Sequence, residues 1–500
     1  KECDWSSDVC SSDLLEETSM KKNFIIFAAL MVTAFFGAEI AKAADVSIGG
    51  QILTRLESNG QGSVTGGSND FSDDTDNSDF VLQRTVVDVK ASINDTTSAF
   101  IQLQSNRGWG SGKFDTSASG ANDGSFEVND RDDSVGIHEA YFTLKNFATL
   151  PVDMKVGRQE IILDGHRIFG DTLWTMGQQT HDGLRLTHQH GNWAINAAYI
   201  IANESAVSTE AAQQNQQDVE NYLLHANYKG ILGGNLSVIY NYLDDPCGNT
   251  ANGADCIADI VLENGIHTVG FRQAGQLFGI DYRGEYYYQW GDADQDGQNM
   301  VGTNDSTAGT GVDRDAYMFG VRLGKAFNNV SMKPSLTVWY DYLSGTNDSD
   351  LRGTDPTFSS FNTVFDTGHK FYGLMDMFLG VGNASDSDNG TNGLGLQDLA
   401  VKAKISPMPG WTVKADYHWF YTAEGVAGNP GALLNGDGSQ DNGLGNELDI
   451  TLVNKYNANT NIMIGFSNYT TTAAFRDLRS VEGDSANWAY LQFDVKRSEE

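Results

Sequence analysis

Residues 277–289 have the sequence LFGIDYRGEYYYQ, in which apolar or aromatic side chains alternate with polar ones. One face of an extended chain would carry Phe278, Ile280, Tyr282, Tyr286 and Tyr288. The other face would carry Asp281, Arg283, Glu285, Tyr287 and Gln289. Such a period of two residues indicates a β-strand with one apolar and one polar face. We therefore predict a strand over residues 277–289.

The same alternation recurs along most of the chain. Eighteen runs show it, with boundaries uncertain by a few residues: 46–57, 80–93, 98–107, 135–145, 152–160, 182–189, 192–201, 218–229, 234–243, 265–273, 277–289, 314–326, 332–343, 396–406, 411–421, 446–456, 460–469 and 487–496. Strands of about ten residues suit a tilted crossing of a lipid bilayer.

The connections between these runs are sorted by length. Nine long polar segments follow the odd-numbered runs: 58–79, 108–134, 161–181, 202–217, 244–264, 290–313, 344–395, 422–445 and 470–486. Eight short links follow the even-numbered ones, such as 94–97, 190–191 and 457–459. A soluble β-sandwich would not sort its loops in this way. The pattern predicts an all-β fold, an 18-stranded antiparallel transmembrane β-barrel with short periplasmic turns and long extracellular loops.

Composition agrees with a barrel of this kind. Mean hydropathy is −0.36, and after residue 43 no run approaches the roughly 18 apolar residues of a membrane helix. Alternating strands average to such a value, because lipid-facing and lumen-facing residues compensate each other. The net charge of −34 excludes nucleic acid as a partner. Most of the excess acid lies in the long connections.

The two ends of the chain are interpreted separately. Residues 20–43 form a signal-peptide pattern, with Lys21 and Lys22, an apolar core and a small-x-small cleavage site before Ala44. Residues 1–19 resemble translated sequencing-adapter sequence, and 497–500 have a similar character. We therefore expect a non-native extension at 1–19, a signal peptide at 20–43, the barrel at 44–496 and a non-native tail at 497–500.

If the apolar face meets lipid, the polar face lines a lumen, and its basic side chains favour the passage of anions. The residues expected to line the lumen and guide solute are Arg84, Arg158, Arg185, Arg272, Arg283, Arg322, Lys402, Lys404, Lys414, Glu139 and Asp416. Strict alternation places Arg158 on the lipid face, and a local bulge would be needed to turn it inward. The competing interpretation is that pairs such as Lys414 and Asp416 are structural salt bridges.

Three further motifs bear on chemistry. Cys247 and Cys256 lie nine residues apart and form either a loop disulfide or two free thiols. Asp292, Asp294 and Asp296 match the first half of a calcium loop, although Thr303 stands where a bidentate acid is expected. The alternative is a solvated acidic loop, and no other cofactor is expected. The scattered histidines lie in no nucleophile motif, so we expect no enzymatic activity.

Several motifs in the chain resemble the bacterial alginate export porin family, over essentially all of residues 46–496. They are Gln83-Arg84-Thr85, His138-Glu139-Ala140-Tyr141, Val156-Gly157-Arg158-Gln159-Glu160, Gly165-His166-Arg167, His181-Asp182-Gly183-Leu184-Arg185-Leu186, Gly368-His369-Lys370-Phe371-Tyr372-Gly373-Leu374-Met375-Asp376 and Ala415-Asp416-Tyr417-His418-Trp419-Phe420. The resemblance implies an 18-stranded monomeric barrel whose lumen arginines and lysines attract acidic polysaccharide. By position, it assigns this role to Arg84, Arg158, Arg185 and Arg322.

The leading hypothesis is a passive, anion-preferring porin of the bacterial outer membrane. The alternatives are a general or sugar-specific diffusion porin and a non-conducting structural or adhesive surface barrel. Expected partners are outer-membrane lipid and lipopolysaccharide, the barrel assembly machinery, and an anionic or sugar solute. The connection 344–395 is a candidate constriction folded into the pore, since its stretch Gly368–Asp376 is apolar and aromatic rather than typical of solvated coil.

Overall fold

The structure is a computed structural model. It describes residues 45–60, 78–109, 135–203, 218–245, 265–293, 312–347, 350, 357–379, 390–425, 442–479 and 483–497. The chain divides into two compact units, Lys1–Asp45 and Val46–Glu500, and the second contains almost all of the described residues. The predicted signal peptide, Cys247, Cys256, Asp294 and Asp296 lie outside the described residues.

Nineteen strands form one sheet. They are β1 (Asp45–Asn59), β2 (Ser78–Ser92), β3 (Thr97–Gly108), β4 (Gly136–Leu144), β5 (Asp153–Gln159), β6 (His181–His190), β7 (Trp193–Asn203), β8 (Val219–Ile231), β9 (Gly234–Asp244), β10 (Ile266–Leu277), β11 (Ile280–Ala293), β12 (Val312–Ala326), β13 (Ser335–Leu343), β14 (Thr357–Phe358), β15 (Leu396–Ile405), β16 (Trp411–Tyr421), β17 (Gly443–Lys455), β18 (Thr460–Thr471) and β19 (Ser485–Arg497).

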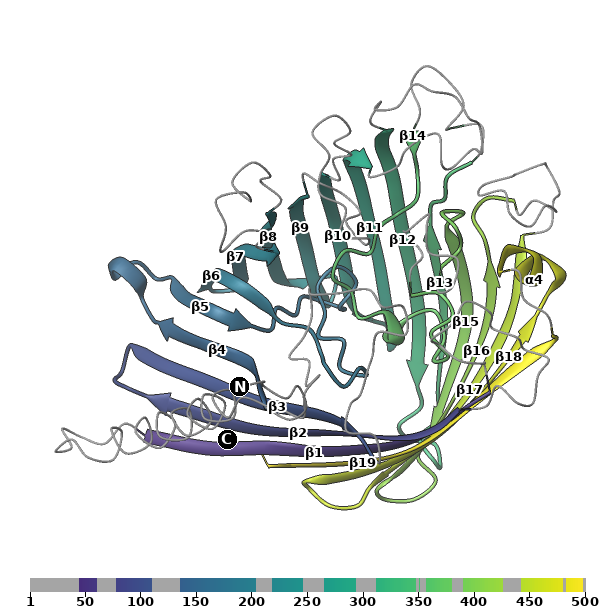
Figure 1. The fold of residues 1–500 in the computed structure, drawn as a ribbon, viewed down its shortest axis with the longest axis horizontal. Helices are drawn as coiled ribbons and strands as arrows, with labels where there is room; N and C mark the ends of the chain where they lie inside the picture. Colours follow the sequence, from purple (N-terminus) through teal and green to yellow (C-terminus); the bar gives the residue numbers. More distant parts are fainter. Residues whose placement is uncertain are drawn as a thin grey trace, which may run out of the picture. The chain divides into compact units, whose positions relative to one another are not determined.

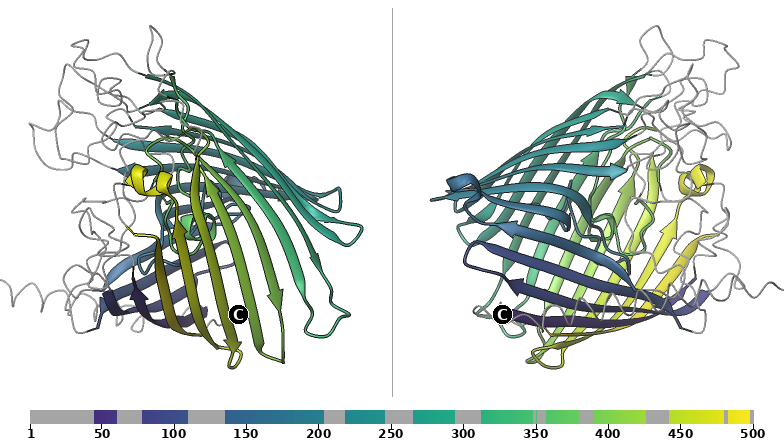
Figure 2. Two further views of the ribbon diagram at one scale, coloured as in Figure 1. Left: turned by 90° about the vertical axis from the view of Figure 1, so that its right-hand side faces the viewer. Right: turned by 60° about the vertical axis from the view of Figure 1, so that its left-hand side comes forward.

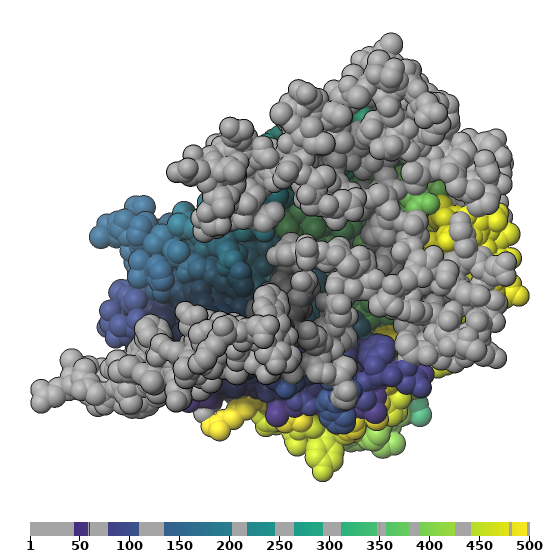
Figure 3. Space-filling view, viewed as in Figure 1, coloured from purple at the N-terminus to yellow at the C-terminus, as the bar shows by residue number. Residues whose placement is uncertain are grey.

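The sheet closes on itself. β14 has two residues and pairs in parallel with β12, so the other 18 strands make up the wall. These strands pair antiparallel with their neighbours in sequence, and β1 pairs with both β2 and β19 (Figures 1 and 2). In the space-filling view, the blue atoms at the left belong to the part of the wall that begins with β4 (Figure 3). The predicted 18-stranded antiparallel barrel is confirmed.

The predicted boundary at Leu277 was wrong. The run 277–289 does not begin a strand at Leu277, because β10 extends to that residue and Phe278 lies in a turn. Phe278 (φ 52°) and Gly279 (φ 73°) both adopt the left-handed region, which a two-residue hairpin turn of the favoured type requires. Leu277 and Ile280 close the hairpin as a pair. Alternation continues through such a tight turn, so the pattern alone does not locate it.

The outward face of the wall is apolar. In β12, Tyr317, Val321 and Leu323 are 38%, 47% and 54% exposed, whereas Ala316 and Met318 on the other face are fully buried. Similar exposed apolar side chains occur on most of the other wall strands, such as Ile52 in β1 and Phe271 in β10. This arrangement suits a barrel surrounded by an apolar medium. None of the helices in the described part of the chain is long and apolar enough to cross a bilayer.

Two connections fold inward. We call residues 160–180 the first inner segment, and residues 357–379 together with 390–395 the second inner segment. The two are joined by a parallel bridge between Phe169 and Phe365. Backbone hydrogen bonds reinforce it, from Gly170 N to Phe365 O (2.8 Å) and from Thr367 N to His166 O (3.1 Å). The two inner segments therefore form one unit (Figure 1).

The inner segments build an apolar core inside the barrel. Phe361, Phe371 and Phe378 are buried, and they belong to one cluster with wall residues such as Met318 and Phe420. The prediction that the stretch Gly368–Asp376 folds into the pore agrees with this packing. The expectation that polar side chains line a lumen does not hold in this region. Its inward apolar side chains face the inner segments rather than water.

Candidate functional site

Three arginines on adjacent strands form the centre of the candidate site. Arg272 (β10), Arg283 (β11) and Arg322 (β12) point into the barrel and are 16%, 11% and 13% exposed. Arg283 and Arg322 are direct partners in the register of β11 and β12. Like charges opposite each other across a strand pair destabilise a sheet by about 0.2–1 kcal/mol. We call these three residues the basic wall.

Two buried carboxylates partly neutralise the basic wall. Glu285 lies 3.8 Å from Arg272 Nε and 4.0 Å from Arg283 Nε, and Asp341 lies 3.5 Å from Arg322 Nη2. Both carboxylates are 1% exposed or less. They hold the guanidinium groups in place without matching the positive charge.

Arg167 of the first inner segment adds a fourth guanidinium group. Its Nη2 donates to Asp341 and lies 3.4 Å from Glu285, and its Nη1 donates to the hydroxyl of Tyr372 at 2.6 Å. Arg167 is 1% exposed, so a fully buried cation joins the inner unit to the wall. Four guanidinium groups therefore share the two carboxylates of Glu285 and Asp341. Asp164 lies near Arg272, and Asp366, whose pKa is about 7, lies near Arg167, so the four guanidinium groups still exceed the ionised carboxylates around them.

Part of the donor capacity of the basic wall is unused. Among the described residues, Arg272 Nε, Arg283 Nη2 and Arg322 Nε are buried without a hydrogen-bond partner. Buried donors are normally paired, and charged ones form their strongest bonds with carboxylate or phosphate oxygens. Unpaired guanidinium donors inside the barrel are suited to bind such oxygens of a solute.

Trp339 of β13 organises the cations around it. The guanidinium of Arg322 lies over its ring, Lys402 Nζ is 4.7 Å from the ring centroid, and Arg283 Cζ is 5.6 Å from it. Attraction between a cation and the face of an indole keeps such side chains ordered. The sequence pattern alone assigns Trp339 no role in the site.

Gly165 of the first inner segment lies directly against the basic wall. A Cβ atom at this position would come within 2.7 Å of Arg283 Nη1 and 3.4 Å of Arg272 Nε. The backbone thus approaches these arginines at a distance that suits glycine. The motif Gly165-His166-Arg167 therefore supplies both a close contact and the bridging cation.

The second inner segment contributes two titratable groups. Burial raises the pKa of Asp366 to about 7. Burial, and then the charge of nearby Arg283, lower the pKa of Lys370. Lys370 thus adds another cation beside the basic wall, in surroundings that are already positive.

Further basic side chains lie between the basic wall and the short turns, namely Lys402, Lys404 and Lys414. Lys402 Nζ lies 2.9 Å from Asp416 Oδ2 and 3.1 Å from His418 Nε2. Lys404 and Lys414 are direct partners in the register of β15 and β16, and both are exposed. Asp416 thus forms a salt bridge with Lys402 rather than with Lys414, the partner that the competing interpretation named, whereas Lys404 and Lys414 repel each other.

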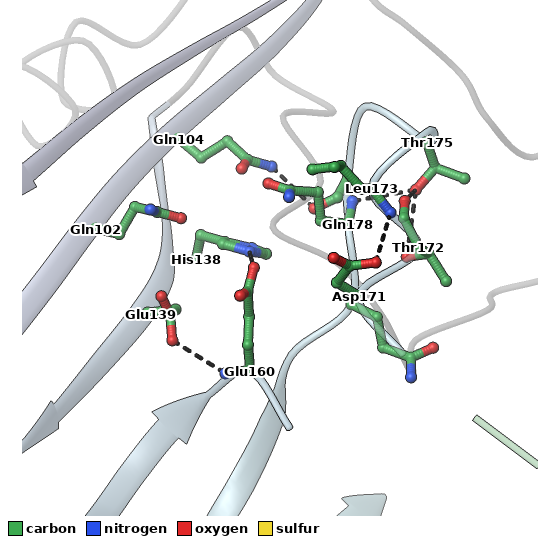
Figure 4. Close-up of polar contacts among 12 residues, drawn as sticks. Gln102, Gln104, His138, Glu139, Glu160, Asp171, Thr172, Leu173, Thr175 and Gln178 are labelled. Atoms are coloured by element: carbon green, nitrogen blue, oxygen red, sulfur yellow. Dashed lines mark hydrogen bonds and ion pairs between the residues drawn. The ribbon is translucent and has the colours of Figure 1, made fainter. Parts of the chain in front are cut away.

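Arg185 and Glu139 lie on the inner wall at other places. Arg185 donates to Asn196 Oδ1 at 2.8 Å and pairs in register with Lys155, another like-charge pair. Glu139 Oε1 accepts the backbone N–H of Glu160 at 3.0 Å and so fixes the start of the first inner segment (Figure 4).

A β-bulge lies at this part of β4. The register with β3 shifts here, and both His138 and Glu139 are buried. Glu160 Oε1 lies 3.6 Å from His138 Nε2. The bulge turns two consecutive side chains inward, which strict alternation excludes.

Arg84 has a different environment from that predicted. Its side chain is fully buried, and Nη1 donates to the carbonyl oxygens of Leu173 (3.4 Å) and Thr175 (3.2 Å). Arg55 of β1 likewise donates to Trp174 O at 2.9 Å and lies over the ring of Trp174. These two arginines anchor the first inner segment, and the structure does not bring them together with the basic wall.

Arg158 is also separate from the basic wall. It pairs with Asp182 at 2.6 Å, and the two side chains are 38% and 50% exposed. The adjacent residue Gln159 is buried, so Arg158 points outward, as strict alternation indicates. A bulge in β5 would be needed to turn Arg158 inward, but the bulge of this region lies in β4.

The remaining site residues are only partly covered by the structure. Asp292 lies near the end of β11, in register with Asp313. No group of three or more His, Cys, Asp or Glu side chains suited to a metal occurs among the described residues. The calcium and disulfide hypotheses stay predictions.

Sequence reasoning missed Arg167 as a site residue. Alternation assigns faces within strands and says nothing about a loop side chain. The motif around residues 165–167 was the one available signal, because it was part of the family resemblance.

The chain is similar to known proteins in its sequence and in its fold. The family described as Alginate export matches residues 45–488. None of the curated proteins matches significantly. Similar solved structures include OccAB3 of Acinetobacter baumannii, with 13% identity, a TM-score of 0.51 and coverage of 91% of this chain and 99% of the other. OpdO of Pseudomonas aeruginosa has 11% identity, a TM-score of 0.50 and coverage of 91% and 97%. At such identity these structures bear on the fold alone.

Proposed function

Because this chain belongs to the alginate export family, we propose that it is a channel through which anionic solutes, such as acidic polysaccharide, pass along a basic lumen. The protein is located in the bacterial outer membrane, as its family and its closed barrel indicate. Its family and fold are those of outer-membrane channels. The solute class and the preference for anions are the parts that we propose.

The basic wall is the observation that carries this proposal. Arg283 faces Arg322, Lys404 faces Lys414, and each pairing weakens the sheet locally. Fixed cations with unpaired donors raise the local concentration of anions in a narrow lumen. Like-charge pairs reduce the stability of the sheet, and such a loss is expected where a site has been selected to bind anions.

The inner segments favour a channel that is narrowed at its middle. Their buried aromatic cluster occupies part of the lumen, whereas inward-facing Lys404, Lys414 and Lys455 near the short turns are exposed. A long polymer would need the inner unit to shift. The same cluster favours the second candidate, a non-conducting structural barrel, in which the inner unit never moves.

Planar-bilayer recordings in a salt gradient test the proposal. We expect the channel to conduct, with a reversal potential whose sign shows selectivity for anions. That selectivity should be smaller in Arg322→Ala and in Arg185→Ala. Cation selectivity that neither substitution changes would exclude the basic-lumen mechanism. Absence of conductance in every condition would favour the structural barrel.

Several other features belong to the proposal. We expect residues 20–43 to direct export of the chain and the barrel assembly machinery to insert it. The long connections would then face the exterior, in contact with lipopolysaccharide, and the short turns the periplasm. We expect a monomer, because a barrel closed by β1 and β19 needs no second copy to complete its wall.

A further inference from the structure

Three consecutive hairpins carry bulky apolar side chains at the tips of their short turns. Leu232 joins β8 to β9, Phe278 joins β10 to β11, and Met332 joins β12 to β13; they are 60%, 98% and 51% exposed. These six strands are neighbours in the wall, so the tips follow one another around the same edge of the barrel. We call Leu232, Phe278 and Met332 the apolar arc.

The backbone of the apolar arc is locally unfavourable. Leu232, Phe278 and Met332 have φ angles of 48°, 52° and 62°, in the left-handed region that bulky residues rarely adopt. In two-residue hairpin turns this position favours Asn or Asp before Gly, whereas here Leu232 and Phe278 precede Gly233 and Gly279. These three residues thus combine an unfavourable backbone conformation with exposed apolar side chains, which is typical of a functional surface.

The apolar arc is accompanied by basic side chains. Lys229, Lys325 and Lys333 are exposed at or beside the same turns. Lys333 lies within the predicted run 332–343, but it precedes β13 and lies in the turn. Within 229–235, 276–281 and 325–335 the single acid is Asp281, which accepts from Gln276 at 2.8 Å and shares the inward face of β11 with Glu285. In a chain of net charge −34, this edge is basic.

We propose that the apolar arc and its three lysines form a surface that binds anionic phospholipid headgroups of the membrane leaflet on the short-turn side. This proposal rests on the proposed function, since it requires the barrel to span a membrane. The apolar side chains would insert among the acyl chains, and the amines would lie at the phosphates. Turn tips that simply faced water would need neither feature.

Two observations favour lipid over a protein partner. The arc continues the outward apolar face of the wall, since Leu277, Ile280 and Leu336 beside the turns are 37%, 43% and 49% exposed. Neighbouring hairpins are separated by two strand spacings, about 10 Å, so the tips are single side chains rather than one broad patch. Separate apolar side chains beside amines match the interfacial region of a bilayer.

The test uses fluorescent labels on the full chain reconstituted in vesicles. In a cysteine-free background, Phe278→Cys carries an environment-sensitive dye. Asn94→Cys in the polar β2–β3 turn and Val321→Cys on the outer face of β12 are the matched controls. We expect lipid-borne quenchers to reach the label at 278, and aqueous iodide to quench it several-fold less than the label at 94.

The two control labels distinguish failure of the proposed lipid-binding surface from failure of the proposed membrane channel. If the label at 321 is quenched from lipid but the label at 278 behaves like that at 94, the barrel spans the membrane and the lipid-binding surface does not exist. A protein partner would then be the favoured explanation of the arc. If the label at 321 is not quenched from lipid, the proposed membrane channel itself is contradicted.

A second experiment tests the lysines and the strain. The rate of insertion into vesicles should increase when phosphatidylglycerol replaces part of the phosphatidylcholine, and Lys229→Gln, Lys325→Gln and Lys333→Gln should each reduce that increase, by up to about fivefold. Phe278→Asn supplies the residue that the turn prefers, so it should match or exceed the wild type in thermal stability in detergent while inserting more slowly into vesicles. Equal insertion rates for all variants would overturn the proposal.

Discussion

Arg167 joins the two inner segments to the wall through Glu285, Asp341 and Tyr372. Because it is fully buried, its loss would remove the hydrogen bonds that Asp341 and Tyr372 accept from it and would leave those two buried groups with one partner fewer. Arg167→Met should therefore destabilise the inner unit by about 3–5 kcal/mol. Limited proteolysis within 160–180 should accelerate, and channel conductance should rise. Arg158→Met removes an exposed pair worth about 0–1 kcal/mol, and it should change neither measurement.

Asp366 gives the second inner segment a pH dependence. Burial raises its pKa to about 7 from the ordinary 3.8, so the folded state favours the protonated form. The stability that this contributes is complete below about pH 4 and is lost as pH rises through 7. Amide hydrogen exchange around residues 363–368, corrected for intrinsic rates, should show more protection at pH 5 than at pH 8. In Asp366→Asn the difference should vanish, and a difference that persists there would assign the effect to another group.

At the scale of elements, alternation predicted the wall strands and the inward direction of Arg272, Arg283 and Arg322, because strand faces follow from a local period of two. It could not predict the β4 bulge at His138 or the burial of Arg84 under carbonyl oxygens of the first inner segment. These depend on contacts between residues far apart in sequence. The extent of β10 was missed for a related reason, since a two-residue turn leaves the alternation intact.

The second inner segment is anchored to β17 by one carboxylate. Glu447 Oε1 accepts the backbone N–H groups of Leu374 (2.6 Å) and Met375 (2.9 Å). Glu447→Ala would leave these two amides unpaired in a buried place, at about 1–3 kcal/mol each. Hydrogen exchange at 374 and 375 should accelerate by at least tenfold, whereas Glu447→Gln, which retains an acceptor oxygen, should have a smaller effect. Unchanged exchange in Glu447→Ala would show that the packing of Phe371 and Phe378 suffices.

At the scale of the whole molecule, an apolar exterior surrounds an interior with an excess of fixed cations. A charge on the exterior should therefore cost more than one inside. Val321→Arg places a charge on the outward face, and we expect a loss of about 2–4 kcal/mol in unfolding experiments in vesicles. Thr412→Arg, on the inward face of β16 near the short turns, should cost much less. Equal losses would contradict the assignment of the two faces.

The most direct test of the central claim is block of the single-channel current by acidic and neutral oligosaccharides of equal length. The account predicts that the acidic oligosaccharide blocks the wild-type channel at a much lower concentration than the neutral one. It also predicts that Arg283→Ala combined with Arg322→Ala abolishes the difference, whereas Arg158→Ala preserves it. Equal block by both oligosaccharides in the wild type would show a general or sugar-specific porin, in which the basic wall does not select the solute.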